Sequence, residues 1–274
     1  MDCIRSEVTQ KMMVCKVGGA TGNDIDNVLM DIAPRKDWVL VHGGSKEVDE
    51  LSEALGRPPK FLTSPSGVVS RYTDKETMDV FTMALAGKLN TQIVARLRAL
   101  GSNAIGLSGE DGGLLIGRRK EAVRAVDNGR VLLVKDDHSG TVDTVNTDLL
   151  EMLLKNGYTP VISPPAITAF GELINTDADR VAGMVAAGLH ADTLLLFTNV
   201  PGLLREPSDP STLIREVPRA QLEFYMNFAY GRMKKKMFAA KEALEGGVSR
   251  VVIASSQVED PVERALSGLG TVIQ

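Results

Sequence analysis

The chain has 274 residues, 43% of them hydrophobic, and is therefore long enough for one large core or two modest lobes. Its net charge of -4 differs from the basic balance of nucleic-acid binders, and no apolar run is long enough to span a membrane. Cys3 and Cys15 lack metal-ligand spacing, and three histidines add no zinc cluster. We expect a globular, cytoplasmic protein that binds neither nucleic acid nor a membrane and holds no metal by itself. Residues 1–11 lack the apolar core of a signal peptide and are interpreted as a loose tail.

Short β-branched runs alternate along the chain with longer segments of helical period. This alternation predicts an α/β fold with a mainly parallel sheet between two layers of helices. The main predicted strands are 12–17, 38–42, 159–163, 193–198 and 250–255, and the main predicted helices are 24–33, 45–56 and 73–100. Two further apolar runs, 112–120 and 129–137, flank a polar connection, and we predict that they pair with each other as a ribbon.

The longest predicted helix carries an apolar stripe with a spacing of four residues. The stripe consists of Phe81, Leu85, Leu89, Ile93 and Leu97, and the small residues Ala84 and Gly87 lie beside it. Ordinary core packing is one interpretation, and a subunit interface is the other. Because two apolar faces exceed what a monomer needs, the second interpretation predicts a homodimer.

The segment "LINTDADR" contains a turn followed by a new helix at Asn175 to Arg180, where the pattern of strands and helices restarts. We therefore predict two lobes of one continuous domain, 12–174 and 175–274, with a soft boundary.

Glycines follow two neighbouring predicted strands. Gly18 and Gly19 come after 12–17, and Gly43 and Gly44 come after 38–42, each pair just before a predicted helix. Bare backbone N–H groups at a helix start bind phosphate oxygens, so these loops predict two anion cradles. Tight turns are the alternative interpretation. The chain has neither the dinucleotide fingerprint nor a G-x-x-x-x-G-K-[ST] loop, which excludes the usual phosphate-binding solutions.

Lysines stand near both predicted cradles. Lys16 ends the first strand, and "GRMKKK", residues 232 to 236 with the preceding glycine, opens a helix, where positive charge opposes the helix dipole. We expect Lys16 and Lys236 to face an anion; a snorkelling lysine and a solvated helix face are the alternatives. Asp179, at the start of another helix, either holds both lysines or serves only as an N-cap.

The catalytic side-chain combinations that the sequence lacks are equally informative. No Ser/His/Asp set and no cysteine beside a histidine is evident, so the reaction needs neither a strong base nor a protein nucleophile. Phosphoryl transfer to a carboxylate has this property, because the acceptor is already ionised. Catalysis then requires alignment of two anions and neutralisation of charge by lysines, backbone N–H groups and Mg²⁺.

The motifs "KVGG", "VHGG", "SRYTDKETMDV", "LSGEDGGLL", "VNTDLL", "LINTDADRVA", "TNVPGLL" and "GRMKKK" resemble, in this order, those of the amino acid kinase family. Within the family the chain is most similar to the acetylglutamate kinase group. The resemblance implies a three-layer αβα sandwich that uses ATP to phosphorylate a side-chain carboxylate.

The resemblance also implies roles for individual residues. Lys16 and Lys236 would stabilise the transferring phosphoryl group, and Asp179 would orient both lysines. The substrate-binding residues would be Gly43, Gly44, Ser45, Arg71, Tyr72 and Asn175. The phosphate- and nucleotide-binding residues would be Gly18, Gly19, Thr198, Asn199, Gly202 and Leu203.

Some positions depart from the acetylglutamate kinase pattern: Ser45, Tyr72, Arg232 and the segment "LVKDDHSGTVDTVN". These features resemble the kinases of the carrier-protein lysine pathway, which implies 2-aminoadipate or glutamate attached to an acidic amino-group carrier protein of the LysW type. An acetylglutamate kinase of arginine biosynthesis and a non-catalytic nucleotide-binding regulator remain alternatives. The basic residues Arg118, Arg119, Lys120 and Arg124 are predicted to attract the acidic carrier; a solvated charged turn is the alternative.

Overall fold

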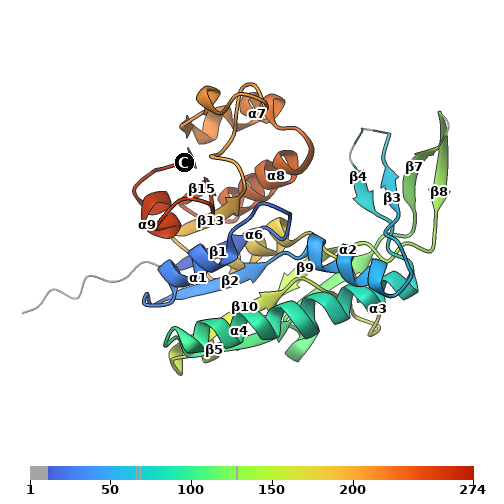
Figure 1. Ribbon diagram of the computed structural model, residues 1–274, viewed down its shortest axis with the longest axis horizontal. Helices are drawn as coiled ribbons and strands as arrows, with labels where there is room; N and C mark the ends of the chain where they lie inside the picture. The colour runs from blue at the N-terminus through green and yellow to red at the C-terminus, as the bar shows by residue number, and fades with distance from the viewer. Residues whose placement is uncertain (1–11, 66, 68, 128) are drawn as a thin grey trace, which may run out of the picture.

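The computed structural model describes residues 12–65, 67, 69–127 and 129–274, so the predicted tail at 1–11 lies outside the described residues. Its centre is an eight-stranded sheet in the order β14-β16-β15-β13-β1-β2-β10-β5 (Figure 1). Neighbouring strands are parallel except β15 and β16. The strands are β1 (Met13–Val17), β2 (Trp38–His42), β5 (Ala104–Ser108), β10 (Thr159–Ser163), β13 (Thr193–Thr198), β14 (Glu216–Val217), β15 (Arg250–Ser255) and β16 (Thr271–Ile273).

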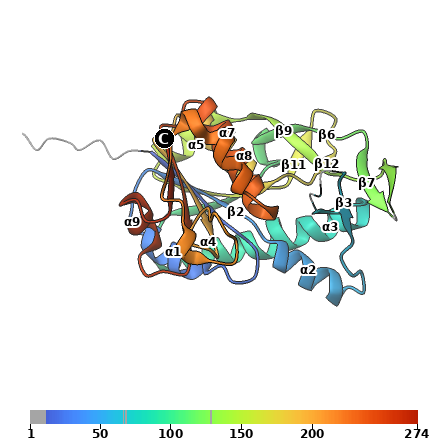
Figure 2. The same cartoon turned by 90° about the horizontal axis from the view of Figure 1, so that it is seen from above.

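Helices cover both faces of this sheet (Figures 1 and 2). One face packs against α1 (Ile25–Ile32), α4 (Asn90–Ala99) and α9 (Pro261–Leu266), and the other against α5 (Thr147–Lys155), α6 (Ala178–Gly188) and α8 (Gly231–Glu245). Side chains alternate along the central strands: Val14 belongs to the hydrophobic core under α5, α6 and α8, and Cys15 to the core under α1, α4 and α9. Burial on both faces explains why these strands are uninterrupted apolar runs. The predicted three-layer αβα sandwich is confirmed.

Smaller elements extend one end of the molecule. A four-stranded sheet has the order β12-β11-β6-β9, formed by β12 (Leu173–Ile174), β11 (Ala166–Thr168), β6 (Leu115–Arg119) and β9 (Gly140–Val145). Two hairpins stand side by side beyond it (Figure 1): β3 (Phe61–Thr63) with β4 (Val69–Arg71), and β7 (Val123–Asp127) with β8 (Arg130–Val134). The remaining helices are α2 (Ser45–Ala54), α3 (Lys75–Thr82), α7 (Leu222–Tyr225) and 3-10 turns at Asp111–Gly113, Pro210–Thr212, Arg219–Gln221 and Met226–Phe228.

The predicted ribbon between 112–120 and 129–137 is wrong. The strand of the second run, β8, pairs with β7, and the strand of the first run, β6, pairs antiparallel with β9 and parallel with β11. Closing the short connection between β7 and β8 costs less chain entropy than pairing across the longer segment. The local hairpin therefore forms, and β6 is left to the more distant strand β9.

The predicted helix 73–100 is continuous but changes type in its middle. A π-helical segment, η1 (Met83–Leu89), joins α3 to α4. On an α-helix, a stripe with a spacing of four drifts about 40° around the axis at each step. The wider turns of a π-helix take back part of this drift and keep the stripe on one side. The stripe residues Phe81, Leu85, Ile93 and Leu97 are buried within the protomer, so the core interpretation is confirmed and the stripe no longer argues for a subunit interface.

The eight-stranded sheet runs through both predicted lobes. The boundary between residues 174 and 175 falls where β12 ends, three residues before α6 begins, and remains a prediction. Among the described residues, no helix combines the length and the apolar character needed to cross a membrane.

Candidate active site

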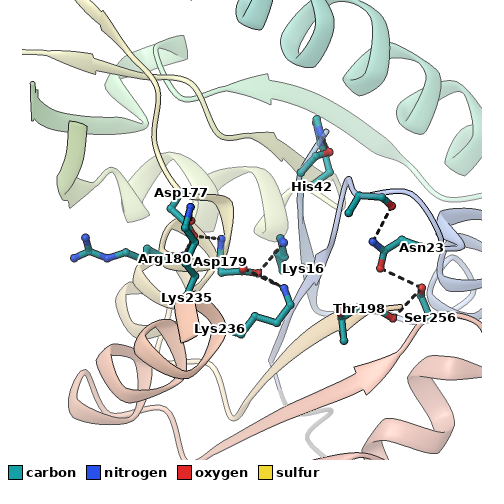
Figure 3. A network of polar contacts seen from close by, with 12 residues as sticks. Lys16, Asn23, His42, Asp177, Asp179, Arg180, Thr198, Lys235, Lys236 and Ser256 are labelled. Carbon is teal, nitrogen blue, oxygen red and sulfur yellow. Dashed lines mark hydrogen bonds and ion pairs between the residues drawn. The ribbon is translucent and has the colours of Figure 1, made fainter. Parts of the chain in front are cut away.

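Two lysines and one aspartate meet near the carboxyl ends of the central strands (Figure 3). Lys16 Nζ lies 2.7 Å from Asp179 Oδ1, and Lys236 Nζ lies 2.8 Å and 3.0 Å from Asp179 Oδ1 and Oδ2. The three residues are buried, with 5% of Lys16, 6% of Asp179 and 5% of Lys236 exposed. The structure thus brings together the three residues that the sequence marks as catalytic candidates.

Three elements that are distant in the sequence supply these side chains. Lys16 comes from β1, which lies between β2 and β13, while Asp179 comes from α6 and Lys236 from α8. Asp177 is the N-cap of α6, because its side chain accepts the N–H groups of Asp179 and Arg180. The interpretation of Asp179 as the N-cap is therefore wrong, and its carboxylate is left to the two lysines.

Ion pairs between α6 and α8 fix the spacing of the central charges. Arg180 Nη2 and Nε lie 2.7 Å and 2.9 Å from the carboxylate oxygens of Glu242, a bidentate arrangement. Lys235 Nζ lies 3.3 Å from Asp177 Oδ2. Each pair includes the residue next to Asp179 or Lys236 in the sequence, so the two helices hold these two charged residues at a defined distance from each other.

The central charges do not cancel, since two lysines share one carboxylate. Burial alone would raise the pKa of Asp179, but Lys16 and Lys236 hold that pKa well below its usual range. Burial lowers the pKa of Lys236 to about 8; Lys16 adds to this effect, and Asp179 opposes it. A buried surplus charge is costly unless it is paired. The site therefore favours a bound anion.

The two glycine loops touch at the ends of β1 and β2. A Cβ on Gly19 would lie 2.0 Å from Gly44 N, and a Cβ on Gly44 would lie 2.1 Å from Leu85 Cδ2. Close packing alone therefore requires glycine at both positions, which agrees with the tight-turn interpretation.

The loops also keep hydrogen-bond donors for an anion. Gly18 N–H donates to Phe197 O, and Gly43 N–H donates to Val17 O. Within the described residues, by contrast, the N–H groups of Gly19 and Gly44 have no acceptor. Two of the four predicted amides are thus available, and that of Gly44, the N-cap of α2, lies at the start of a helix, where the dipole favours negative charge.

Thr198 and Asn199 border the loop after β1. Thr198 O accepts the N–H of Ser256 at 2.8 Å, and Asn199 Nδ2 donates to Thr21 O at 3.3 Å. Asn23 Oδ1 lies 3.5 Å from Ser256 Oγ, so this network joins the loop after β1 to the ends of β13 and β15 (Figure 3). A shallow hollow of about 440 Å³ opens beside it, lined by Gly22, Asn23, Asp24, Ile25, Asp26 and Gln257.

Gly202 and Leu203 lie deeper in the same lobe. A Cβ on Gly202, whose φ is 157°, would lie 2.5 Å from Thr271 Oγ1, and Leu203 is fully buried. Leu203 N–H donates to the same hydroxyl at 2.8 Å. The structure therefore places the Leu203 side chain in the core, and a role for this residue in nucleotide binding remains a prediction.

Ser45 and Arg71 lie between the second glycine loop and the β3–β4 hairpin. Arg71 Nη1 lies 2.6 Å from Asp49 Oδ1, Nη2 donates to Ser45 O at 3.3 Å, and the guanidinium lies 5.3 Å from the centroid of the Phe61 ring. Ser45 Oγ donates to Gly19 O at 3.2 Å. Contacts on several sides thus hold Arg71 in one orientation.

Tyr72 and Asn175 fasten the end of the β3–β4 hairpin. Tyr72 Oη donates to Asp136 at 2.5 Å, and this hydrogen bond raises the pKa of Tyr72 to about 12. Thr73 N–H donates to Asp137 Oδ2 at 3.0 Å, and Asn175 Nδ2 donates to Thr73 Oγ1 at 2.9 Å. Two departures from the acetylglutamate kinase pattern, Tyr72 and the segment 133–146, therefore contact each other.

The predicted basic cluster divides into paired and unpaired residues. Arg118 is exposed but forms two hydrogen bonds, of 2.8 Å and 2.9 Å, with Asp143. Arg119 pairs with a carboxylate at 2.6 Å and donates to two backbone carbonyls. Lys120 and Arg124 are exposed and form no ion pair within the described ranges. Only the latter two have a charge that is unpaired.

A model of the amino acid kinase family matches residues 11–255. The chain belongs to the amino acid kinase family. A [LysW]-aminoadipate kinase of Deinococcus radiodurans is 50% identical over 275 residues, which cover 99% of this chain and 93% of that protein. A protein of the same name from Thermus thermophilus is 49% identical over 96% of this chain and 100% of its own length. An acetylglutamate kinase of Methanopyrus kandleri is 40% identical, covering 96% of this chain and 100% of that protein.

Solved structures support the fold of an amino acid kinase. An N-acetylglutamate synthase of Neisseria gonorrhoeae matches with a TM-score of 0.77 and 23% identity over 96% of this chain, which spans 59% of that longer chain. Carbamate kinase of Giardia lamblia bound to AMP-PNP matches with a TM-score of 0.65 and 16% identity, covering 97% of this chain and 98% of that one.

Sequence reasoning missed several polar contacts around this kinase site. The Arg180–Glu242 pair, the Asn23–Ser256 contact and the contact between His42 and Asn90 join residues that are at least 48 positions apart. No local pattern marks such pairs. His42 alone gave a signal, because it precedes the second glycine pair.

The lowered pKa of Lys236 predicts an alkaline decline in activity. Below pH of about 8 the side chain is protonated and cationic, whereas above it the charge is lost and turnover should fall. Because kcat/KM reports the free enzyme, its pH profile is the measurement. In Lys236→Arg, whose side chain stays charged, the decline near pH 8 should disappear even if the rate is lower. Lys236→Met and Lys16→Met should lower kcat by roughly two to three powers of ten at every pH. An unchanged decline in Lys236→Arg would assign it to another group.

Proposed function

We propose that this kinase transfers the γ-phosphoryl group of ATP to the side-chain carboxylate of 2-aminoadipate or glutamate attached to an amino-group carrier protein of the LysW type, giving an acyl phosphate for lysine or arginine biosynthesis. The observation that carries the reaction type is the buried Lys16–Asp179–Lys236 cluster with its surplus positive charge. The relatives near 50% identity, both named [LysW]-aminoadipate kinase, support the substrate class.

The cluster suits the transfer of a phosphoryl group between two anions. A carboxylate acceptor needs no base, so the protein has only to align it and stabilise negative charge that moves from donor to acceptor. Lys16 and Lys236 would supply that stabilisation, and Asp179 would keep both ammonium groups pointing into the site. The free amides of Gly19 and Gly44 would add two neutral donors.

ATP and Mg²⁺ fit the residues that are present. The surplus charge and the two unpaired amides suit the triphosphate, and the Thr198–Asn199 edge lies beside the first glycine loop. ATP supplies the phosphoryl group, and Mg²⁺ neutralises part of its charge. Mg²⁺ keeps several waters and binds largely through substrate phosphates. Within the described residues, no cluster of three or more His, Cys, Asp or Glu side chains could hold a metal alone.

The amino-acid part of the substrate would lie on the other side of the glycine loops. Arg71 would bind its free carboxylate, with Ser45 and Asn175 beside it. The contact of Arg71 with Asp49 keeps the guanidinium in place and uses only part of its set of five N–H donors. Tyr72, bonded to Asp136, would form part of the wall that the two hairpins present to a carrier-linked substrate.

The choice of substrate tests this proposal directly. Carrier-linked aminoadipate, carrier-linked glutamate and free acetylglutamate should be compared side by side in an ATP-consumption assay. We expect kcat/KM for a carrier-linked acceptor to exceed that for acetylglutamate by at least about tenfold, or about 1.4 kcal/mol. A preference for acetylglutamate would favour the second candidate, which the 40% identical acetylglutamate kinase supports. Absence of turnover with all three would favour a nucleotide-binding regulator.

Carrier association should depend on the unpaired basic residues Lys120 and Arg124. Charges at the rim of an interface act mainly on the association rate and are screened by salt. The double variant Lys120→Glu/Arg124→Glu should therefore lower kcat/KM for the carrier-linked acceptor, flatten its salt dependence and leave KM for ATP unchanged. Arg119 is unsuitable for this test, because its reversal would break contacts that hold the local fold.

The matched control is Arg219→Glu/Arg264→Glu, which has the same change in net charge. Both residues are exposed in the other half of the molecule and form no ion pair among the residues described. Equal salt slopes in the two double variants would contradict carrier docking at the base of the β7–β8 hairpin.

We further propose a homodimer and a cytoplasmic location, which rest on the resemblance to the family and on the two cysteines. Light scattering at micromolar concentration should give about twice the chain mass of 29.4 kDa. A single species of 29.4 kDa would contradict the dimer.

A further inference from the structure

A second polar cluster lies on the opposite face of the sheet from the lysines. Its members are His42, at the end of β2, and Asn90, the first residue of α4, with 0% and 5% of their surfaces exposed. Leu40, two residues before His42, belongs to the core under α1 and α4, whereas Val41 belongs to the core under α6 and α8. His42 therefore faces away from the lysine cluster, as Figure 3 shows.

The contacts of Asn90 determine where the histidine carries its proton. Asn90 Nδ2 lies 3.0 Å from Val161 O and 3.1 Å from His42 Nε2. A backbone carbonyl only accepts hydrogen bonds, so the atom that faces Val161 O must be the amide nitrogen. The second N–H of this nitrogen is then directed to His42 Nε2, which must accept it and carries no proton.

The remaining ring nitrogen is therefore the donor. Burial lowers the pKa of His42 to about 4, so the ring is neutral at physiological pH and carries its single proton on Nδ1. Nδ1 lies 3.2 Å from Gly43 O. The neutral ring thus donates to the carbonyl of the residue that follows it, and Asn90 fixes this tautomer.

The peptide that receives this hydrogen bond is the one in the second glycine loop. In a trans peptide the C=O of Gly43 and the N–H of Gly44 point to opposite sides of one plane. Holding Gly43 O therefore fixes the direction of Gly44 N–H, one of the two amides that have no acceptor among the described residues. Gly44 N also lies next to Gly19, in the first glycine loop.

The π-helical segment η1 supports the Gly43–Gly44 peptide in two ways, by direct packing and by the position that it gives to Asn90. A Cβ on Gly44 would meet Leu85 Cδ2 at 2.1 Å and Leu89 Cδ2 at 2.9 Å, so η1 packs directly against the loop. Asn90 follows the last residue of η1. Removing one residue from the wide turn would rotate Asn90 by about 100° around the helix and away from His42. π-Helical turns are frequent at functional sites.

We propose that His42 and Asn90 are positioning residues, which orient the Gly43–Gly44 peptide so that Gly44 N–H faces the anionic groups of the bound substrates. This inference rests on the proposed phosphoryl transfer and deepens it. Lys16 on β1 is the charged group that, in addition to burial, lowers the pKa of His42. β10 contributes the Val161 carbonyl, and Lys88 of η1 is exposed and paired with Glu47 of α2.

Two conservative substitutions separate the hydrogen bonds of the ring. In His42→Asn, the side-chain Nδ2 can take the place of ring Nδ1 and still donate to Gly43 O. In His42→Gln, the side-chain Oε1 can take the place of Nε2 and accept from Asn90, but the donor to Gly43 is lost. His42→Asn removes one methylene group more than His42→Gln, so a loss of packing alone would make His42→Asn the more damaged variant, opposite to the order expected here. We expect kcat of His42→Gln to be about ten- to a hundredfold below that of His42→Asn, at similar KM for ATP. Equal kcat values, or a faster His42→Gln, would overturn the proposal.

Nitrogen NMR of the wild-type imidazole provides a readout that is independent of activity. With only three histidines in the chain, the His42 signals can be assigned by their loss in His42→Asn. We expect the Nδ1–H tautomer without titration between pH 6 and 9, as the pKa of about 4 requires. An Nε2–H tautomer, or a titration in that range, would overturn the inference even if the wild type is an active kinase. A wild type without turnover would instead remove the proposed function, and the tautomer would still be determined.

Discussion

One carboxylate shared by two buried lysines is the constraint on which the rest of the structure depends. Removing three charges from water is costly, and the Lys16–Asp179–Lys236 cluster recovers that cost only through short contacts. Those contacts require β1, α6 and α8 to meet at one point. Parallel pairing on both sides of β1 brings Lys16 there, and the Arg180–Glu242 ion pair holds α6 beside α8. A surplus positive charge remains in the site, and a bound anion would neutralise it.

Much of the fold follows from local sequence, because each central strand is buried on both faces. The predicted strands 38–42, 159–163, 193–198 and 250–255 coincide with β2, β10, β13 and β15. The pairing of the peripheral strands was not predictable in the same way. An alternating pattern of apolar and polar residues indicates that a segment is a strand, but it does not indicate which strand pairs with it. β6 pairs with β9, which follows the β7–β8 hairpin in the sequence.

The candidate site shows the same division between local and distant information. Lys16, Asp179 and Lys236 were identified by their motifs, and the structure places both ammonium groups within 3.0 Å of the Asp179 carboxylate. Arg119 looked like a free surface charge but is held by backbone carbonyls that come from another strand connection. Asn90 interrupts no hydrophobic stripe and belongs to no motif. Its role became visible only through its distances to Val161 and His42.

The two faces of the sheet therefore divide the work of the proposed reaction. On one face, charged side chains meet the phosphoryl group, and their number exceeds what the protein itself can neutralise. On the other face, a neutral histidine and an amide hold backbone geometry without adding charge. Burial keeps the pKa of His42 low, so the ring adds no third positive charge to the two lysines across the sheet. The glycine loops connect both faces, since only a backbone without side chains can pass between Gly19 and Leu85 at such short distances.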